Sequence, residues 1–473
     1  MLELLPNLIK QPGIPLYFQL YQYIKEEIVT GSIEVGAKLP SIRQLSNHLH
    51  LSKNTIETAY QQLIAEGYVE SRSRSGLYVI SVEESIIPLV EEVLSKDKPV
   101  PQKDEFIEHM INFQYGDVEL EHFPLAVWKK CLNTALHEAP LQDVLGYGER
   151  QGNMELRVEI ARYLFQARGV RCSSDQIVIC SGTQQAINLL CQLLQLQGKR
   201  IAMEEPGYHG VRTVFHNHGC TTHPIPLDSD GINVEQLQQS GANTVYVTPS
   251  HQFPMGMVLP IQKRNRLLQW ANAYDSLIIE DDYDSEFRYI GQPIPALKSL
   301  DHNGRVIYLG TFSKSFLPAM RMSYIVLPDP LVASFCERLE PYSQSASSLL
   351  QHAVMRFMRN GHFERHIRKM RRLYHAKHEA LLSAVHTYMG DRVEVIGQKS
   401  GLHLLLNVHN NHTRDQLIAS AKAVGVIVYS PRQSWSEPES CPASYIMLGF
   451  GGLSEQSIDT GIRKLAHAWF DGL

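Results

Sequence analysis

The sequence lacks the features that mark a membrane, secreted or disulfide-bonded protein. Charged residues, glycine or proline interrupt each apolar run before it reaches the roughly 18 residues that cross a bilayer. The beginning of the sequence has neither the basic nor the apolar segment of a secretory leader. The 7 cysteines are scattered and form no C-x-x-C pair, which favours a reducing compartment. We therefore expect a cytoplasmic protein that does not contact a membrane.

A large net charge of one sign is also absent. The 44 Lys and Arg residues are opposed by 49 Asp and Glu residues, so the net charge is −5. No overall positive field therefore attracts nucleic acid, and such a partner must be met by a local surface. The content of hydrophobic residues, 44%, is that of a folded globular chain, and the length of 473 residues predicts more than one domain.

The composition changes most clearly at residues 81–108. This stretch contains three prolines and many charges but little apolar periodicity. We interpret it as a tether, with an ordinary surface excursion as the alternative. The tether separates a small domain at 1–80 from a large domain at 109–473, in which apolar runs alternate with amphipathic stretches as in α/β folds.

The small domain is predicted to contain three short helices and a hairpin. Apolar residues at helical spacing from Leu16 to Ile28 indicate the first helix. Ser41 and Ser52 can cap a second and a third helix with a short turn between them, which is the spacing of a helix-turn-helix. After Gly67, two β-prone segments flank a basic turn that resembles a wing.

Cations gather on part of this small domain. No acid occurs from Lys38 to Thr55, and basic residues follow on the hairpin. The first turn of the third helix offers short polar side chains and free amides that can reach phosphates and base edges. A protein-interaction domain with solvated caps is the alternative. The candidate DNA-contacting residues are Arg43, Ser52, Lys53, Asn54, Thr55, Arg72 and Arg74.

The run LPSIRQLSNHLHLSKNTIETAYQQLIAEGYVESRSRSGLYV resembles the winged helix-turn-helix of GntR-type bacterial transcription factors. The resemblance covers nearly the whole run. It implies a double-stranded operator DNA as partner. It also implies DNA contacts from Arg43, Lys53, Asn54, Thr55 and the wing around Gly76.

Two motifs of the large domain offer sites for an anion and a flat ring. Ile177 to Cys180 predict a buried strand, and the turn that follows opens a helix whose free amides can bind a phosphate. In EEPGYHG, a Pro-Gly turn presents Tyr208, whose ring can lie against a heteroaromatic ring. An ordinary strand-to-helix turn and a core tyrosine are the alternatives. The turn consists of Ser181, Gly182, Thr183 and Gln184.

A third motif, SLIIEDDYDSEF, places acids where a strand from Leu277 to Ile279 ends. A carboxylate at this place, such as Asp281, can keep a heteroaromatic nitrogen protonated, because the ion pair favours the charged form of both groups. Tyr283 can donate a hydrogen bond to a phenolate oxygen. Metal ligation by Glu280 to Asp282 is the alternative, although no further acid cluster supports it.

A fourth motif, VIYLGTFSKSFLPAMRMSYIV, predicts a strand that ends near Leu309 and delivers Ser313 and Lys314 into a loop. A neutral lysine amine forms Schiff bases with carbonyl compounds. Ser313 and Arg321 offer ligands for a phosphate dianion. A solvated surface lysine is the alternative, and these two neighbours argue against it.

These parts together are what pyridoxal 5'-phosphate requires of a protein. The block from about Ile111 to Leu473 resembles the fold-type I aminotransferases, and the whole chain resembles the MocR/GabR subfamily of GntR regulators. The implied fold is multidomain, a small α+β winged helix-turn-helix followed by a large α/β aminotransferase-like domain. The resemblance also implies a homodimer in which Tyr147, from GYGERQGNMELR, reaches the partner's site.

The resemblance assigns a role to each motif. Lys314 would carry the cofactor as an aldimine, Asp281 would pair with the pyridine nitrogen, and Tyr283 with the ring hydroxyl. Tyr208 would lie against the ring face. The residues at or near the phosphate would be Ser181, Gly182, Thr183, Gln184, Ser313 and Arg321.

Two positions depart from the aminotransferase pattern. Phe253, in TPSHQFPMG, stands where these enzymes carry an Asn that contacts the cofactor hydroxyl, which leaves His251 or Gln252 as substitutes. Met447, in YIMLGFGGLS, stands where they commonly place an Arg for the substrate carboxylate. Arg432 is then the candidate for that carboxylate, with an exposed loop arginine as the alternative. A weakened clamp disfavours fast turnover.

Residues 356–377 carry 8 Lys and Arg residues against one Glu. A solvated helix face is the default interpretation, and a secondary DNA-facing patch is the alternative. His362 and His366 have helical i, i+4 spacing, but no cysteine or acid cluster accompanies them, so we expect no metal site.

The leading hypothesis is a transcription regulator that binds an operator through residues 1–80. It would sense a small amine or amino acid by external aldimine formation on the cofactor at Lys314. A working aminotransferase localised by its winged domain is one alternative. Another is a regulator of pyridoxal phosphate synthesis that senses the cofactor itself.

Overall fold

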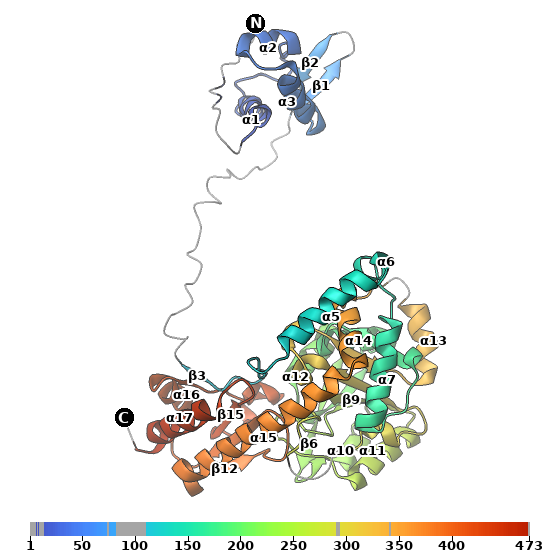
Figure 1. Cartoon of the computed structure of the whole chain (residues 1–473), viewed down its shortest axis with the longest axis vertical. Helices are drawn as coiled ribbons and strands as arrows, with labels where there is room; N and C mark the ends of the chain where they lie inside the picture. The colour runs from blue at the N-terminus through green and yellow to red at the C-terminus, as the bar shows by residue number, and fades with distance from the viewer. Residues whose placement is uncertain are drawn as a thin grey trace. The chain divides into compact units, whose positions relative to one another are not determined.

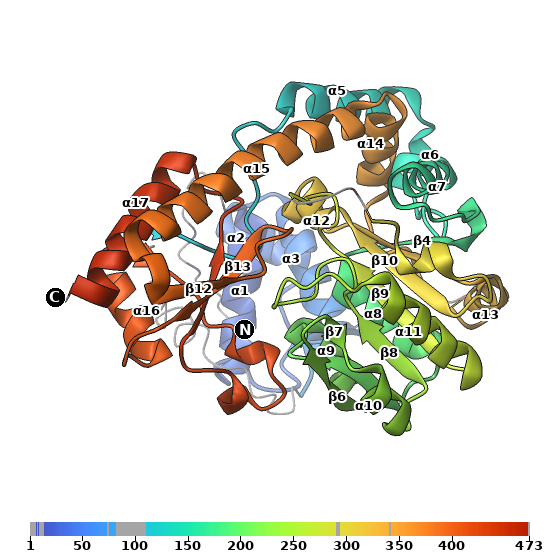
Figure 2. The same ribbon diagram turned by 90° about the horizontal axis from the view of Figure 1, so that it is seen from below.

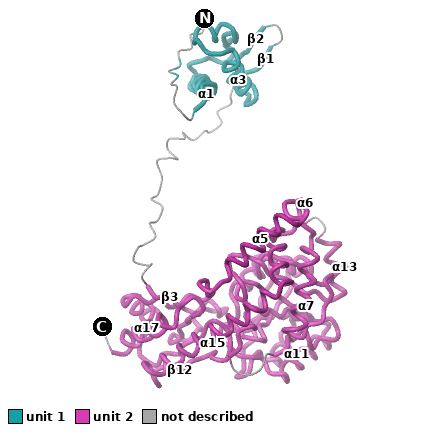
Figure 3. Tube along the Cα trace, viewed as in Figure 1, with its two compact units in different colours: residues 1–104 teal, residues 105–473 magenta. Residues whose placement is uncertain are grey.

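The computed structural model of the protein describes residues 6, 8, 14–72, 75–81, 110–289, 294–339 and 342–471. The chain forms two compact units, residues 1–104 and 105–473, which have different colours in Figure 3 and whose helices and strands are labelled in Figure 1. The tether expected at 81–108 lies outside the described residues from 82 onward. No helix of the described residues is long and apolar enough to cross a membrane.

The first unit contains the expected helix-turn-helix and hairpin. Ser41 caps the second helix by accepting from the Gln44 N–H, and Ser52 caps the third by accepting from the Thr55 N–H. The two strands are antiparallel and pair Val69 with Val79. The elements are α1 (Leu16–Val29), α2 (Ile42–Leu49), α3 (Lys53–Ala65), β1 (Val69–Arg72) and β2 (Gly76–Val79).

The core of this unit comes from one apolar stripe on each helix. Leu20 and Ile24 of α1 pack with Ile56 and Leu63 of α3, and all four side chains are fully buried. Helical spacing places each pair on one face, and burial of those faces fixes the three helices against the hairpin. The polar first turn of α3 therefore remains on the outside.

The second unit is built on an eight-stranded sheet of order β4-β11-β10-β9-β8-β5-β6-β7. The run from β10 through β9, β8 and β5 to β6 is parallel, and β11 is antiparallel to both of its neighbours. The strands are β4 (Ile177–Cys180), β5 (Arg200–Glu205), β6 (Thr221–Asp228), β7 (Gly231–Ile232), β8 (Thr244–Val247), β9 (Leu277–Asp282), β10 (Val306–Thr311) and β11 (Ser323–Val326).

Helices cover both faces of this sheet (Figure 2). Alternate residues of β10 show why: Tyr308 packs into a core with α5, α7 and α14, whereas Ile307 and Leu309 pack on the opposite face with α8. The sheet helices are α5 (Leu125–Glu138), α6 (Leu141–Leu145), α7 (Met154–Arg168), α8 (Thr183–Leu193), α9 (His209–Asn217), α10 (Val234–Gln239), α11 (Ile261–Ala273), α12 (Phe312–Ser315), α13 (Asp329–Arg338) and α14 (Ser348–Arg359).

A smaller C-terminal layer completes the second unit. The long helix α15 packs against α17, and their buried residues share a core with a three-stranded antiparallel sheet of order β12-β13-β15. A short parallel pair joins β3 to β14, so the chain enters the unit beside its C-terminal layer. These elements are β3 (Ile111–Asn112), α15 (His362–Met389), β12 (Val393–Ile396), β13 (His403–Val408), α16 (Arg414–Ala423), β14 (Val426–Ile427), β15 (Tyr445–Gly449) and α17 (Glu455–Ala466).

Candidate functional site

A cavity of about 340 Å³ lies where β8, β9 and β10 end. The carboxyl ends of parallel strands are the usual ligand-binding edge of an open α/β sheet. Predicted cofactor residues from four separate segments meet here. Those that line the cavity are Thr183, Gln184, Tyr208, Asp281, Tyr283, Ser313, Lys314 and Arg321.

Asp281 forms the acidic wall of the cavity. Its Oδ2 accepts a hydrogen bond of 2.5 Å from the Tyr246 hydroxyl, whereas its buried Oδ1 has no partner. Burial raises the pKa of Asp281 to about 7, and neighbouring carboxylates add to the shift. A buried carboxylate without a cation is costly, so this position suits a protonated ring nitrogen.

The two acids beside Asp281 point elsewhere, because successive side chains of a strand face opposite sides. Glu280 accepts from the backbone N–H groups of Leu297 and Lys298. Asp282 accepts from the Arg168 guanidinium at 2.7 Å. The metal alternative for Glu280 to Asp282 thus lacks a shared centre, because the three carboxylates have separate partners.

Lys314 lies on the one-turn helix α12 and not in a loop. The preceding strand β10 continues to Thr311, beyond the predicted end near Leu309, and its Thr311 side chain caps α12 by accepting from the Ser313 N–H. Lys314 Nζ lies 4.5 Å from the centroid of the Tyr115 ring. Burial lowers the pKa of Lys314 to about 8, so this amine loses its proton more readily than an ordinary lysine.

The turn before α8 and Arg321 form a cationic corner. Gly182 has a φ of 101°, and a Cβ atom there would lie 2.5 Å from the Arg321 guanidinium. Glycine therefore lets the guanidinium lie against the start of α8, where free amides favour an anion. Ser181 does not line the cavity, and its N–H donates to Gln185.

Tyr208 and Phe253 contribute aromatic walls. Tyr208 precedes α9, and its ring lies 5.6 Å from that of Phe253 in a T-shaped arrangement. Phe253 is buried and also contacts the rings of Tyr115 and His403. The position at which aminotransferases carry Asn therefore supplies an apolar surface here.

Neither suggested substitute for that Asn lines the cavity. The Gln252 amide donates to the carbonyls of Pro206 and Phe253, which makes it part of the loop's support. His251 contacts a residue that lines the cavity: its Nδ1 lies 3.0 Å from the Tyr283 hydroxyl and 2.9 Å from Asp284. The Tyr283 hydroxyl also donates to the His251 carbonyl, so this buried pair fixes the position of Tyr283.

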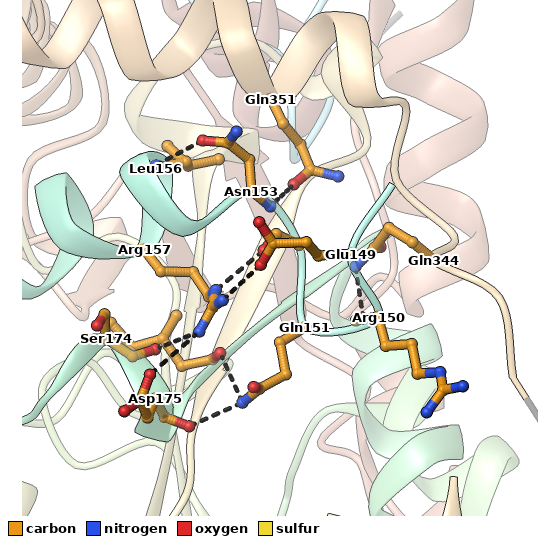
Figure 4. A network of polar contacts seen from close by, with 12 residues as sticks. Glu149, Arg150, Gln151, Asn153, Leu156, Arg157, Ser174, Asp175, Gln344 and Gln351 are labelled. Atoms are coloured by element: carbon orange, nitrogen blue, oxygen red, sulfur yellow. Dashed lines mark hydrogen bonds and ion pairs between the residues drawn. The ribbon is translucent and has the colours of Figure 1, made fainter. Parts of the chain in front are cut away.

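Tyr147 lies apart from the cavity and is 96% exposed. The chain just after it is anchored by the network in Figure 4, in which buried Arg157 donates to Glu149 and to the carbonyl of Ser174. Gln351 accepts from the Asn153 N–H in the same network. The anchored segment leaves Tyr147 projecting from the surface.

The C-terminal carboxylate candidate, Arg432, also lies outside the cavity. Arg432 is exposed on a one-turn helix, Arg432–Ser434, and does not line the cavity. That helix packs on the turn before Tyr208, where the Gly207 N–H donates to the Ser434 carbonyl at 2.8 Å. Met447 is buried in an apolar cluster with Phe253 and Leu405.

In the first unit, the predicted DNA-contacting cations remain accessible. Arg43 and Lys53 are exposed, the first on α2 and the second at the start of α3. Asn54 is exposed beside Lys53, and Thr55 shares a hydrogen bond with Ser52. Arg74 lies outside the described residues.

The described residues of the wing contact one another and Lys38. Arg72 donates to Glu70 at 2.7 Å and lies over the Tyr78 ring. Gly76 has a φ of 118°, and a Cβ atom there would lie 2.9 Å from Lys38 Cε, so glycine leaves room for that lysine. Lys38 thus joins the same surface as the hairpin.

The basic segment 356–377 spans the end of α14 and the first half of α15. Arg356 and Arg359 pair with acids of neighbouring helices. The exposed cations Arg365, Arg368, Lys369 and Arg372 recur at helical spacing on α15. His366 is buried, and burial lowers its pKa to about 4. Among the described residues, it belongs to none of the groups of His, Cys, Asp and Glu side chains that lie close enough to bind a metal ion. A DNA-facing role for this segment stays a prediction.

Several site residues were missed from the sequence. Tyr115 and Asp117 follow β3, far from the other motifs. Tyr246 is the next-to-last residue of the apolar strand β8. No local signal distinguishes these residues. Only their strand-end positions could have suggested that they reach the same edge of the sheet.

Both units match the models of known protein families. Residues 16–79 match the family model for bacterial regulatory proteins of the gntR family, and residues 108–440 match aminotransferase class I and II. A probable rhizopine catabolism regulatory protein, MocR, of Rhizobium meliloti is 32% identical, over 97% of this chain and 95% of its own. The chain is a MocR-type regulator of the GntR family.

Other relatives support the same organisation. An uncharacterized HTH-type transcriptional regulator of Bacillus subtilis, YdeL, is 40% identical to this protein, over 99% of this chain and 100% of its own. A multiple substrate aminotransferase from Thermococcus profundus has a similar fold, with a TM-score of 0.70 and 27% identity, over 82% of this chain and 96% of that one. The fold-type I α/β fold is confirmed. Class I and II aminotransferases bind pyridoxal phosphate, and the GntR head implies a DNA partner.

Proposed function

We propose that this MocR-type regulator holds pyridoxal phosphate at Lys314 and changes its operator binding when a small amine occupies the same cavity. The observation that carries the proposal is the juxtaposition of Lys314, Asp281 and Arg321 around one cavity of a chain that also has a helix-turn-helix. A regulator without a ligand needs no such cavity.

The donor set fits the cofactor at each of its ends. The unpartnered Oδ1 of Asp281 can accept from the ring nitrogen, and the corner formed by Arg321 and the start of α8 can bind the phosphate. Tyr208 and Phe253 offer ring faces and edges between these ends. Tyr283 can donate to the ring hydroxyl if its single O–H proton turns toward the cavity from the His251 carbonyl.

When bound, pyridoxal phosphate supplies an aldehyde that reacts reversibly with primary amines. The chain's own residues determine how this site receives an amine. Burial lowers the pKa of the Lys314 amine to about 8, so the amine loses its proton more readily near neutral pH than an exposed lysine does. Asp281 would keep the ring nitrogen protonated, and the rings of Tyr208 and Phe253 line part of the cavity wall.

Coupling to DNA requires a difference in affinity between two states of the whole protein, because an effector that binds both states equally shifts nothing. We infer that the dimer provides those states. Leu141 and Leu145 are 65% and 68% exposed beside Tyr147, and a second copy would cover this apolar surface. Tyr147 would then enter the partner's site.

The DNA-binding role of the helix-turn-helix can be tested by Arg43→Ala. The expected result is an operator affinity at least about tenfold lower, with a salt dependence reduced by roughly one phosphate contact. DNA footprinting and binding titrations at several salt concentrations measure both. Arg463→Ala, which removes an exposed cation of α17, is the matched control and should leave binding unchanged. Equal losses in the two variants would contradict a specific role for α2.

The cavity can be tested through pH. Because only the neutral amine reacts, the rate at which apoprotein takes up pyridoxal phosphate should rise about tenfold per pH unit and level off above pH about 8, the pKa of Lys314. Stopped-flow absorbance measures this rate. A rate that keeps rising to pH about 10 would indicate an ordinary exposed lysine instead.

A further inference from the structure

The cofactor would not use all of the charged side chains of the cavity. Among the described residues that line it, the cationic side chains are Lys314 and Arg321, and the acidic ones are Asp281 and Asp117. In the proposed function, three of these four are committed to the cofactor: Lys314 to its aldehyde, Arg321 to its phosphate and Asp281 to its ring nitrogen. Asp117 alone is left for the effector.

Asp117 lies beside the reacting amine. A Cβ atom on the preceding Gly116 would lie 3.1 Å from Lys314 Nζ, so this part of the chain passes next to the lysine. Burial raises the pKa of Asp117 and the nearby Lys314 opposes the shift, which also indicates that the two groups interact. Asp117 remains accessible to solvent, as expected for a residue at the mouth of the cavity.

The backbone around Asp117 is tightly held. A Cβ atom on Gly451 would lie 2.4 Å from the Asp117 carbonyl oxygen, and one on Gly452 would lie 2.9 Å from Asp117 Cβ. These glycines let the loop after β15 pack directly against the Asp117 backbone. The carboxylate is therefore carried by a braced segment and not by a free loop.

A matching group for a carboxylate effector is missing from the described cavity wall. Met447 replaces the arginine expected on β15 and is buried against Phe253. Arg432 is exposed outside the cavity. A carboxylate placed near Asp117 would meet a like charge, which disfavours its binding.

We propose that Asp117 selects effectors with a second, protonated amino group, so that the effector of this regulator is a diamine or another basic amine. One amino group takes the position beside Lys314, and the distal ammonium pairs with the Asp117 carboxylate. Charge complementarity of this kind distinguishes ligands that share the same carbon chain. The inference rests on the proposed function of the cavity.

Matched probes with the same chain and different ends test this selectivity. They are 1,5-diaminopentane, 1-aminopentane and 5-aminopentanoate, with the corresponding three-carbon set. Titrations of the cofactor-loaded full chain, followed by the change in visible absorbance, give apparent Kd values. The diamine should bind about tenfold more tightly than the monoamine, and the amino acid more weakly than both. The diamine preference should fall as salt concentration rises.

Asp117→Asn should reduce the ratio of diamine affinity to monoamine affinity about three- to tenfold, because any effect that Asp117 exerts through Lys314 acts on both probes and cancels in the ratio. Glu121→Gln, which removes an exposed carboxylate of the same segment outside the cavity, should change none of the three affinities. An equal loss for all three probes would mean that Asp117 acts only through Lys314 and would overturn the inference.

Two further outcomes separate this inference from the proposed function. If the protein takes up the cofactor and responds to amines but prefers 5-aminopentanoate, the diamine inference is wrong and the proposed function stands. If the protein takes up no cofactor at Lys314, the proposed function itself fails, and selectivity at Asp117 fails with it.

Discussion

Lys314→Ala is expected to abolish covalent attachment of pyridoxal phosphate and, with it, every effect of an amine on operator binding. Among the described residues that line the cavity, Lys314 is the lysine, and its lowered pKa of about 8 suits it to act as the nucleophile in the proposed function. Alanine leaves no amine at that place. The attached cofactor's visible absorption band should disappear, and borohydride should fix no label to the chain.

The same variant separates sensing from folding. Operator binding without effector should remain, because α2 and α3 form a core of their own. Lys399→Ala, which removes an exposed lysine of the same unit, should keep the visible band and the amine response. If ligand-dependent regulation persists unchanged in Lys314→Ala, covalent sensing is wrong. Repeated turnover of an amino acid to a keto acid by the native protein would favour a working aminotransferase instead.

Asp281→Asn should weaken cofactor binding about 10- to 150-fold. A neutral amide cannot stabilise a protonated ring nitrogen, and a hydrogen bond to a charged group contributes about 1.5–3 kcal/mol. Equilibrium dialysis of pyridoxal phosphate measures the loss. The visible band of any cofactor that still binds should shift, because the ring nitrogen is no longer held protonated.

The same substitution is expected to have the opposite effect on the stability of the apoprotein. In the native chain the pKa of Asp281 is raised to about 7, above its usual 3.8, so the charged carboxylate destabilises the folded apoprotein and this cost grows as pH rises from about 4 to 7. Asp281→Asn removes the cost, and thermal unfolding at pH about 8 should show equal or higher stability.

Asp282→Asn is the matched comparison on the same strand. Its side chain faces away from the cavity and pairs with buried Arg168, which would keep its charge without a charged partner. This variant should therefore lower the melting temperature of the apoprotein. Cofactor affinity of the protein that remains folded should change little. The reverse pattern, a stable Asp282→Asn and an unstable Asp281→Asn, would contradict the assignment of the two acids.

The sequence alone determined those features that depend on neighbours in the chain. Ser41 and Ser52 cap the helices they were expected to cap, because a cap needs only an N–H three residues later. The strand Ile177–Cys180 and the turn after it follow from a local apolar run ended by glycine. The sequence motif also singled out Lys314, although its loop proved to be a short helix.

Only the tertiary structure decided which side chains share the cavity. Strand order brings Tyr246 to Asp281, and the short β3 strand carries Tyr115 and Asp117 to Lys314 from about 200 residues away in the chain. It also left Ser181, Tyr147 and Arg432 outside the cavity. Caps and periodicity arise from local hydrogen bonds and side-chain direction, whereas a binding site depends on how distant strands pair.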